Sequence, residues 1–223
     1  MLPLVTCIVP TYNRHDLLKK SLNMFKQQTY PKLEMIVVDD SEQPCSLNLP
    51  NNVRYVRLNA RRSIGYKRNL AIQYAQGELV AFWDDDDYHG PKRIENQVRQ
   101  MIKTNADVVA DANHVYLYNS RYYTLRDRPD IQEHLWWKRI LMASIMFRKN
   151  ITKYASFPHR YTSEDREFFK KILKQRELNI HLWQSPSVDF VYNIHSMTNP
   201  WSVYMAQMIS VTKPYSKHFL CVK

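Results

Sequence analysis

The segment between residues 4 and 38 has the pattern of two strands joined by a helix. Residues 4–9 form a run of apolar and β-branched side chains that is typical of a buried strand. Apolar residues then recur at helical spacing between Leu17 and Phe25, and a second apolar run follows at residues 33–38. Two strands connected through a helix lie parallel in one sheet, and parallel sheets are buried beneath helices. The pattern therefore predicts an α/β fold around a mostly parallel sheet.

The rest of the chain continues this alternation of strands and helices. Further strands are predicted at residues 53–58, 79–83, 107–110, 114–118, 142–147 and 188–192. Asn13 is expected to cap the first helix, Gly77 to end a helix, and Pro91 to be the first residue of the next one. Thr162 and Asp165 form a capping pair for a later helix. A chain of 223 residues is long enough for one such domain with a full core.

The composition narrows the classes of partner and compartment. Lys and Arg number 32 against 21 Asp and Glu, so a nucleotide, a nucleic acid or an acidic membrane surface is an expected partner. The three separated glycines exclude a G-x-G-x-x-G or Walker phosphate loop. Three widely spaced cysteines favour a reducing compartment without structural zinc. No charged leader or membrane-spanning apolar run is present, so we expect a cytoplasmic protein, soluble or peripherally membrane-associated.

Four consecutive aspartates, Asp84 to Asp87, follow the predicted strand at residues 79–83. Two carboxylates about 6 Å apart repel by roughly 3 kcal/mol at an effective dielectric near 20, so such a cluster needs a cation, raised pKa values or full solvation. Hard carboxylate oxygens suit Mg²⁺ or Mn²⁺. The alternative is a solvated acidic turn that Gly90 and Pro91 end. An acidic cluster joined to an apolar strand in a basic chain favours a cation site.

Other polar groups follow the ends of the neighbouring predicted strands. Residues 10–13 follow the first strand, and Asp39 and Asp40 end the second. Open parallel sheets bind ligands beyond the carboxyl ends of their strands, so these groups are expected to share one crevice with the aspartates. The cations Arg61, Arg62, Lys67 and Arg68 lie at the start of a predicted helix, where they oppose its dipole. A phosphate or an acidic partner nearby would explain them.

Four further features are open to a functional or a structural interpretation. Glu164 and Asp165 either carry chemistry or serve the dipole of the helix they begin. His195 is either a metal ligand or a satisfied structural group. The pair Trp136 and Trp137 either packs in the core or exposes one ring as a platform for a sugar. The segment from residue 200 is either a packing helix or a membrane-surface contact.

Five stretches together resemble glycosyltransferase family 2, whose members are inverting enzymes with the GT-A fold. They are V-T-C-I-V-P-T-Y-N-R at residues 5–14, M-I-V-V-D-D-S at 35–41, G-Y-K-R-N-L-A-I at 65–72, G-E-L-V-A-F-W-D-D-D-D at 77–87 and S-E-D-R-E-F at 163–168. The resemblance covers roughly residues 4–200. It implies a single Rossmann-like domain over residues 1–200, with a nucleotide-binding half at about 1–110, an acceptor-binding half at about 111–200 and a C-terminal extension at 201–223.

The resemblance also implies roles for individual residues. Pro10, Thr11, Tyr12 and Asp40 would hold the base and ribose of a nucleotide, Lys67 and Arg68 would lie along it, and Asp84 or Asp85 would face the ribose. Asp86 of the D-x-D element would ligate Mn²⁺ or Mg²⁺, with His195 as a less secure ligand. Asp165, beside Glu164, would be the general base.

The implied reaction moves one sugar from a nucleoside diphosphate sugar, a UDP-sugar above all, to a hydroxyl of a glycan, protein or lipid-linked acceptor. The Q-x-x-R-W element of processive relatives is missing, since Gln184-Ser185-Pro186 does not supply it, so a non-processive enzyme is expected. A glycosyltransferase of this kind is not expected to have a nucleic-acid partner. The alternatives are a basic nucleic-acid-binding module, a nucleotidyltransferase on the same type of fold, and a catalytically inactive sugar-binding relative.

Overall fold

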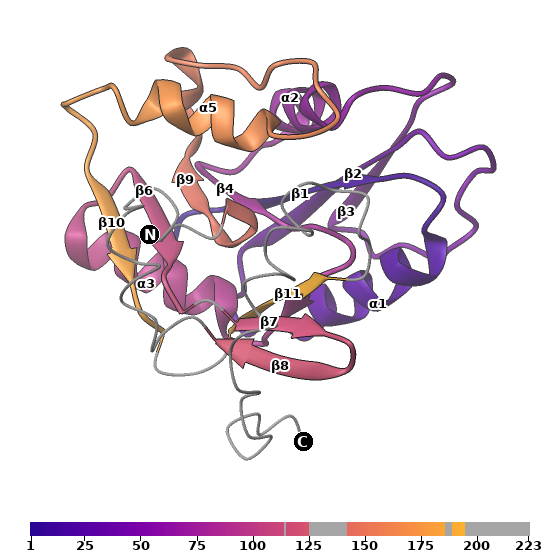
Figure 1. The fold of residues 1–223 in the computed structure, drawn as a ribbon, viewed down its shortest axis with the longest axis horizontal. Coiled ribbons are helices and arrows are strands. Elements are labelled where there is room, and N and C mark those ends of the chain that lie inside the picture. The colour runs from indigo at the N-terminus through magenta and orange to yellow at the C-terminus, as the bar shows by residue number, and fades with distance from the viewer. Residues whose placement is uncertain (114, 125–141, 186–188, 195–223) are drawn as a thin grey trace.

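The computed structural model describes residues 1–113, 115–124, 142–185 and 189–194, which form two sheets with helices around the larger one (Figure 1). The larger sheet has the order β10-β6-β9-β4-β1-β2-β3. Its strands are β1 (Val5–Thr11), β2 (Leu33–Asp39), β3 (Val53–Arg57), β4 (Leu79–Phe82), β6 (Val108–Asp111), β9 (Met146–Arg148) and β10 (Ile180–Trp183). Only β9 runs antiparallel to its neighbours β4 and β6, so the predicted, mostly parallel α/β fold is confirmed within the described residues.

Four helices cover the two faces of this sheet. They are α1 (His15–Lys26), α2 (Ile64–Tyr74), α3 (Arg93–Thr104) and α5 (Glu164–Ile172). On β1, Cys7 belongs to the apolar cluster beneath α1 and α3, whereas Ile8 belongs to the cluster beneath α2 and α5. Successive strand side chains point to opposite faces, so β1 is buried from both sides. Figure 1 shows α2 and α5 on one side of the sheet and α1 and α3 on the other.

A smaller sheet lies beside the first; the strands predicted at residues 114–118 and 188–192 belong to it, but a second sheet was not expected from the sequence. It has the order β5-β11-β7-β8, with β5 (Tyr88–His89), β11 (Phe190–Ile194), β7 (Val115–Tyr118) and β8 (Arg121–Thr124). Two short 3₁₀ turns, Met142–Ser144 and Lys149–Lys153, flank β9. The strand predicted at residues 142–147 is therefore shorter and later than expected, because its first half forms one of these turns.

The expected capping residues of α1 and α5 were wrong. Asn13 has φ 51° and α1 begins at His15 without a side-chain cap. Thr162, the cap predicted for α5, lies one residue too early: Ser163 precedes the helix with φ 59°, and its side chain makes no cap bond either. A capping side chain reaches the first turn from an extended backbone, which these left-handed residues do not have. Asn13 instead accepts the Glu42 N–H at 2.9 Å and joins two loops at the end of the sheet.

Gly77 and Pro91 also differ from their expected roles. The helix α2 ends at Tyr74, and Gly77 has no positive φ. A Cβ at Gly77 would lie 2.6 Å from Thr6 Oγ1 and 2.8 Å from Leu4 O, so glycine is required for close approach to β1. Pro91 lies two residues before the first residue of α3.

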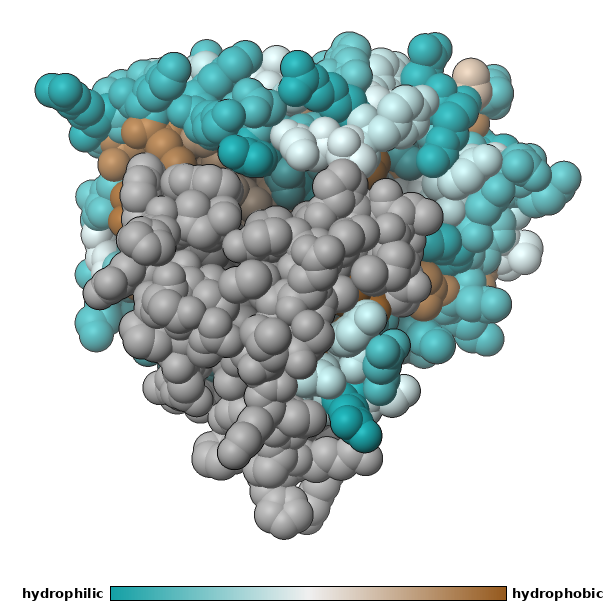
Figure 2. All heavy atoms as spheres, viewed as in Figure 1, coloured by the Kyte–Doolittle hydropathy of each residue, from teal (hydrophilic) through white to brown (hydrophobic). Residues whose placement is uncertain are grey.

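The surface above α2 and α5 is mainly hydrophilic, as Figure 2 shows. Within the described residues, none of the helices has the length and apolar character needed to span a bilayer.

Gly65 lets the segment before α5 pass against the first turn of α2. The Gly65 N–H donates to Arg160 O at 3.3 Å, and a Cβ at Gly65 would lie 1.9 Å from Pro158 O. A carbon cannot approach a backbone oxygen this closely, so a larger side chain would force the helix and the segment apart. Gly65 therefore sets the distance between α2 and the chain leading into α5.

We expect Gly65→Ala to lower the free energy of unfolding by about 1–3 kcal/mol, because the backbone must shift to admit the methyl group. Urea unfolding followed by circular dichroism measures the change. Gln73→Ala, at an exposed position of the same helix, is the control and should stay within about 0.5 kcal/mol of the wild type. Equal stability of the two variants would mean that the contact at Pro158 is not rigid.

Candidate active site

The carboxyl ends of β1, β2 and β4 meet at one edge of the large sheet. Thr11 pairs with Asp39 across β1 and β2, and Ile8 pairs with Phe82 across β1 and β4. The Thr11 hydroxyl donates to Asp85 Oδ2 at 2.5 Å, which ties the end of β1 to the aspartate cluster after β4. The polar groups that the sequence placed at three strand ends therefore share one site, as expected from the parallel arrangement.

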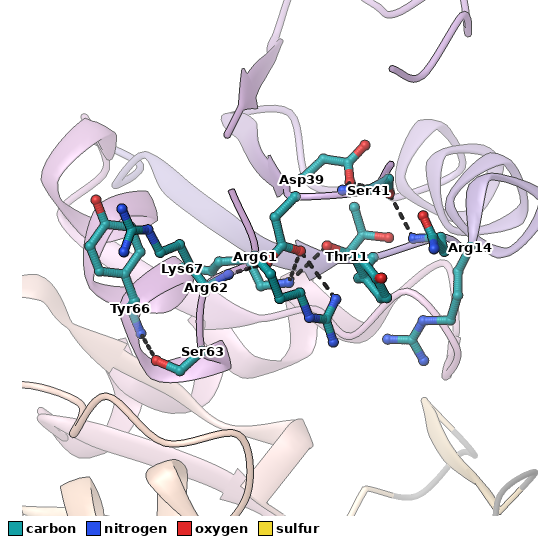
Figure 3. Close-up of polar contacts among 12 residues, drawn as sticks. Thr11, Arg14, Asp39, Ser41, Arg61, Arg62, Ser63, Tyr66 and Lys67 are labelled. Atoms are coloured by element: carbon teal, nitrogen blue, oxygen red, sulfur yellow. Dashed lines mark hydrogen bonds and ion pairs between the residues drawn. The ribbon is translucent and has the colours of Figure 1, made fainter. Parts of the chain in front are cut away.

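Asp40 is the centre of a buried polar cluster next to this edge. Lys67 Nζ donates to Asp40 Oδ1 at 2.8 Å and to Thr11 O at 2.8 Å. The Arg62 N–H donates to Asp40 Oδ2 at 2.6 Å, and Arg61 Nη1 lies 3.4 Å from Asp40 Oδ1. Figure 3 shows Lys67 of α2 and Arg61 of the loop before it directed toward this cluster, whereas the Arg62 side chain lies beside Tyr66 and Arg62 contributes its backbone N–H. Burial lowers the pKa of Lys67, and its hydrogen bond to Asp40 partly offsets this.

Tyr12 presents its ring beside that cluster, while Pro10 and Thr11 are buried. The Tyr12 hydroxyl donates to Glu42 Oε1 at 3.3 Å. The Arg61 guanidinium lies over the ring, with Cζ 3.1 Å from its centroid. The predicted donor-binding residues of the first two strands are thus gathered at one place, together with a cation that the sequence did not assign to them.

The four aspartates divide into two buried and two partly exposed side chains. Asp85 and Asp87 are buried, whereas the side chains of Asp84 and Asp86 keep 23% and 20% of their surface exposed. Burial raises the pKa of Asp85 to about 7, with Arg14 opposing the shift and Asp86 adding to it. Burial and the charges of Asp86 and Asp84 also raise the pKa of Asp87. The raised pKa values of the buried aspartates and the charges of Arg14 and Arg68 thus reduce the repulsion between carboxylates that the sequence predicted.

Among the described residues, Arg14 is the cation that contacts both Asp85 and Asp86. Its Nη2 lies 2.9 Å from Asp85 Oδ1, and its Nη1 donates to Asp86 Oδ2. The sequence analysis missed this residue, although a basic side chain directly after a strand end that faces four acids was an available signal. Arg14 lies between Asn13, which has a positive φ, and the first residue of α1, so the turn at Asn13 determines its position.

Arg68 connects the aspartate cluster to the first turn of α5. Its Nη2 donates to Asp84 Oδ1 at 3.1 Å, and its Nη1 lies 3.4 Å from Glu164 Oε1. Burial alone would lower the pKa of Arg68, but Asp84, Glu164 and Asp165 raise it above its ordinary value. The structure therefore brings the two acids of α5 next to the aspartates. Asp165 is less buried than Glu164, and its Oδ1 accepts the Arg166 N–H at 2.6 Å.

The carboxylates of this site suit a hard divalent cation whose coordination shell would be completed by substrate phosphates. No three His, Cys, Asp or Glu side chains of the described residues converge to form a closed metal site. Mg²⁺ commonly uses only one or two protein carboxylates and takes its other ligands from phosphates and water. Asp84 and Asp86, two residues apart and both partly exposed, meet that requirement. Asp85 Oδ1, buried beside them, is paired with Arg14 Nη2 at 2.9 Å, so among the described residues Asp84 and Asp86 are the more accessible ligands.

Several predicted features fall on residues that the structure does not describe. His195, the pair Trp136 and Trp137, and residues 201–223 lie outside the described residues. Their predicted roles remain predictions, as do the division into two halves and the roles of the individual site residues.

Comparison with known proteins identifies the family. The sequence model of "Glycosyl transferase family 2" matches residues 6–173. A relative from Escherichia coli, the UDP-Glc:alpha-D-GlcNAc-diphosphoundecaprenol beta-1,3-glucosyltransferase WfaP, is 26% identical over 213 residues, which cover 86% of this chain and 78% of WfaP.

Two solved structures resemble the fold. Staphylococcus aureus TarS 1–349 in complex with UDP-GlcNAc has a TM-score of 0.67 and 22% identity, covering 85% of this chain and 58% of that one. The mannosyltransferase PcManGT from Pyrobaculum calidifontis, in complex with GDP-Man and Mn²⁺, has a TM-score of 0.62 and 18% identity, covering 96% and 66%. The chain thus spans less than two thirds of these solved chains, and the predicted GT-A architecture is confirmed. Because the family match extends over most of its length, this protein belongs to glycosyl transferase family 2.

Proposed function

We propose that this chain is an inverting glycosyltransferase that moves one sugar from a nucleoside diphosphate sugar to an acceptor hydroxyl, non-processively. The observation that carries the proposal is the contact of Arg68 with both Asp84 and Glu164. This buried bridge fixes the acids of α5 opposite the aspartate cluster, at the edge where an open parallel sheet binds ligands. A donor-binding carboxylate group and a proton acceptor are thereby held on two sides of one site.

Tyr12 and Asp40 are the proposed contacts of the nucleotide base, with Pro10 and Thr11 behind them. Lys67 supports Asp40 through a buried ion pair, while Asp84 or Asp85 would meet the ribose. A uridine nucleotide is the first choice of donor, because TarS is described in complex with UDP-GlcNAc and WfaP is named for a UDP-glucose donor.

Asp86, aided by Asp84, would hold Mn²⁺ or Mg²⁺, with His195 as a further candidate ligand. A bound divalent cation at this place would stabilise negative charge on the leaving diphosphate. The chain itself contributes the buried charge of Arg68 and the guanidinium of Arg14 to the same region. These two arginines keep the aspartates ionisable while the phosphates are absent.

Asp165 is the proposed general base. A sugar or polyol hydroxyl has a pKa far above 7, so a carboxylate must take its proton as the new bond forms, which is typically worth about 10²- to 10⁴-fold in rate. Arg68 holds Glu164, and Glu164 begins the helix that carries Asp165. One such carboxylate opposite the leaving group gives a single displacement with inversion.

The acceptor is proposed to be a glycan or a lipid-linked saccharide. WfaP is named for a diphosphoundecaprenol-linked acceptor, and TarS is named a poly(ribitol-phosphate) transferase. The acceptors in both names carry phosphate, which suits a chain of net charge +11 and a peripheral contact with an acidic membrane.

A donor screen tests this function. UDP-, GDP-, dTDP- and CMP-sugars are added with and without Mn²⁺, and the unfolding temperature and hydrolysis of the donor are measured. We expect one nucleotide, a uridine nucleotide first, to raise the unfolding temperature in a cation-dependent way, because a ligand that binds only the folded state stabilises it. No stabilisation and no hydrolysis with any donor would contradict the proposal.

A prediction about cation binding follows from the position of Arg14. We expect Arg14→Met to bind Mn²⁺ roughly three- to tenfold more tightly without nucleotide, because the guanidinium no longer competes for Asp86. Electron paramagnetic resonance of free Mn²⁺ measures the affinity. Lys19→Met removes an exposed charge from α1 and should change it less than about twofold. Weaker Mn²⁺ binding in Arg14→Met would mean that Arg14 supports the site.

A further inference from the structure

Arg61 makes the two contacts, with Tyr12 and Asp40, that a nucleobase bound at the proposed donor site would make. Its guanidinium lies over the Tyr12 ring, with Cζ 3.1 Å from the ring centroid. Its Nη1 lies 3.4 Å from Asp40 Oδ1. A nucleobase is also a planar group with N–H donors, and it would use the ring for stacking and the carboxylate for a hydrogen bond. Stacking and donation at the same two residues therefore make Arg61 and a base competitors.

Asp40 has little capacity left for a ligand while Arg61 is in place. Its side chain is fully buried, Oδ1 receives Lys67 and Arg61, and Oδ2 receives the Arg62 N–H at 2.6 Å. Lys67 and the backbone of Arg62 belong to the buried frame of the site. Arg61 is the partner that could leave, because 45% of its side-chain surface is exposed, against 3% for Lys67.

A second aromatic ring is available to the displaced side chain. Arg61 Cζ lies 5.7 Å from the centroid of Tyr161, whose surface is 53% exposed. A guanidinium can stack on either ring at similar cost, so a short rotation would free Tyr12 without leaving the arginine unpartnered. Figure 3 shows the Arg61 side chain extending past Thr11.

We propose that Arg61 occupies the base subsite of the donor-free enzyme and must leave it before a nucleotide binds. The inference rests on the proposed donor site at Tyr12 and Asp40 and deepens it. Breaking the stacking contact and the partly exposed ion pair opposes binding, so removal of the side chain strengthens nucleotide affinity. If Arg61 simply attracted phosphate, removal of its side chain would weaken nucleotide affinity instead.

The test compares Arg61→Ala with Arg62→Ala. Arg62 is the matched control because it is adjacent, loses the same charge and lies over a different ring, Tyr66, at 5.3 Å. Calorimetry measures the affinity for UDP with Mn²⁺ and for uridine, which has no phosphate and so removes the general effect of charge. We expect Arg61→Ala to bind both probes about three- to tenfold more tightly than Arg62→Ala. Thermal unfolding of both variants verifies that they fold.

Equal or weaker affinity in Arg61→Ala than in Arg62→Ala, with UDP bound by the wild type, would overturn the inference and leave the proposed function standing. If the wild-type chain bound none of the nucleotides of the donor screen, UDP included, both the inference and the proposed function would be overturned. Tighter binding of uridine by Arg61→Ala supports displacement specifically, because uridine carries no charge for a cation to attract.

Discussion

Asp165→Asn is expected to reduce turnover by two or more orders of magnitude while UDP affinity stays within a few-fold of the wild type. The asparagine keeps an Oδ1 that can accept the Arg166 N–H, so the first turn of α5 is preserved. What is lost is the proposed acceptor of the hydroxyl proton, whose contribution would appear in the transition state alone. Turnover and UDP affinity are measured separately, by product formation and by calorimetry.

Glu167→Gln is the control for this experiment, because it neutralises another acid in the first turn of the same helix. Its turnover should stay within about threefold of the wild type, since Glu167 pairs with Lys170 away from the aspartates. If Asp165→Asn lost affinity and turnover to the same degree, Asp165 would have a structural role instead.

Asp86→Ala is expected to weaken Mn²⁺ binding and Mn²⁺-dependent UDP binding together, each by about tenfold or more, because the proposed carboxylate ligand of a hard cation is lost. UDP affinity measured without Mn²⁺ should change much less. Mn²⁺ titration and UDP calorimetry, with and without the cation, measure the two effects.

Asp16→Ala removes an exposed acid from α1 and controls for the change in total charge. Urea unfolding should separate a loss of ligand from a loss of structure, since Asp86 also pairs with Arg14. Retention of Mn²⁺-dependent affinity in Asp86→Ala would reassign the ligand to a neighbouring aspartate, with Asp84 as the partly exposed candidate.

The sequence predicted the larger sheet because its strands are continuous apolar runs with helices between them. β1, β2 and β4 were placed to within one or two residues, since burial on both faces leaves an unmistakable hydrophobic pattern. In the smaller sheet, β7 and β11 were predicted as strands, but their membership of a second sheet was not, because β5 has two residues and pairs with β11, a partner about 100 residues away. Such pairing leaves no local periodicity.

Helix beginnings were predicted less well than strands for a different reason. Asn13 and Ser163 are residues that commonly cap helices, yet both adopt a left-handed backbone. That choice depends on the loops they join, such as the contact of Asn13 with Glu42, and not on their own chemistry. Local propensity could not reveal it.

The candidate site was predicted in outline from the strand ends. Polar residues at the ends of parallel strands must converge, so the meeting of Thr11, Asp40 and the aspartates was available from order alone. The order also placed Arg14 directly after a strand end, but the contacts that Arg14 and Arg61 make could not be predicted, because each depends on the rotamer of a long side chain and on the loop behind it. Both arginines fill places that the sequence analysis reserved for ligands.

The buried guanidinium of Arg68 has a consequence for how the site responds to pH. Neighbouring acids raise the pKa of Arg68, so its guanidinium stays charged across the neutral range. The acids that it joins behave differently, because burial raises the pKa of both Asp84 and Glu164. Any loosening of the contact between the aspartate cluster and α5 as the pH falls should therefore begin with protonation of these acids and not at the arginine.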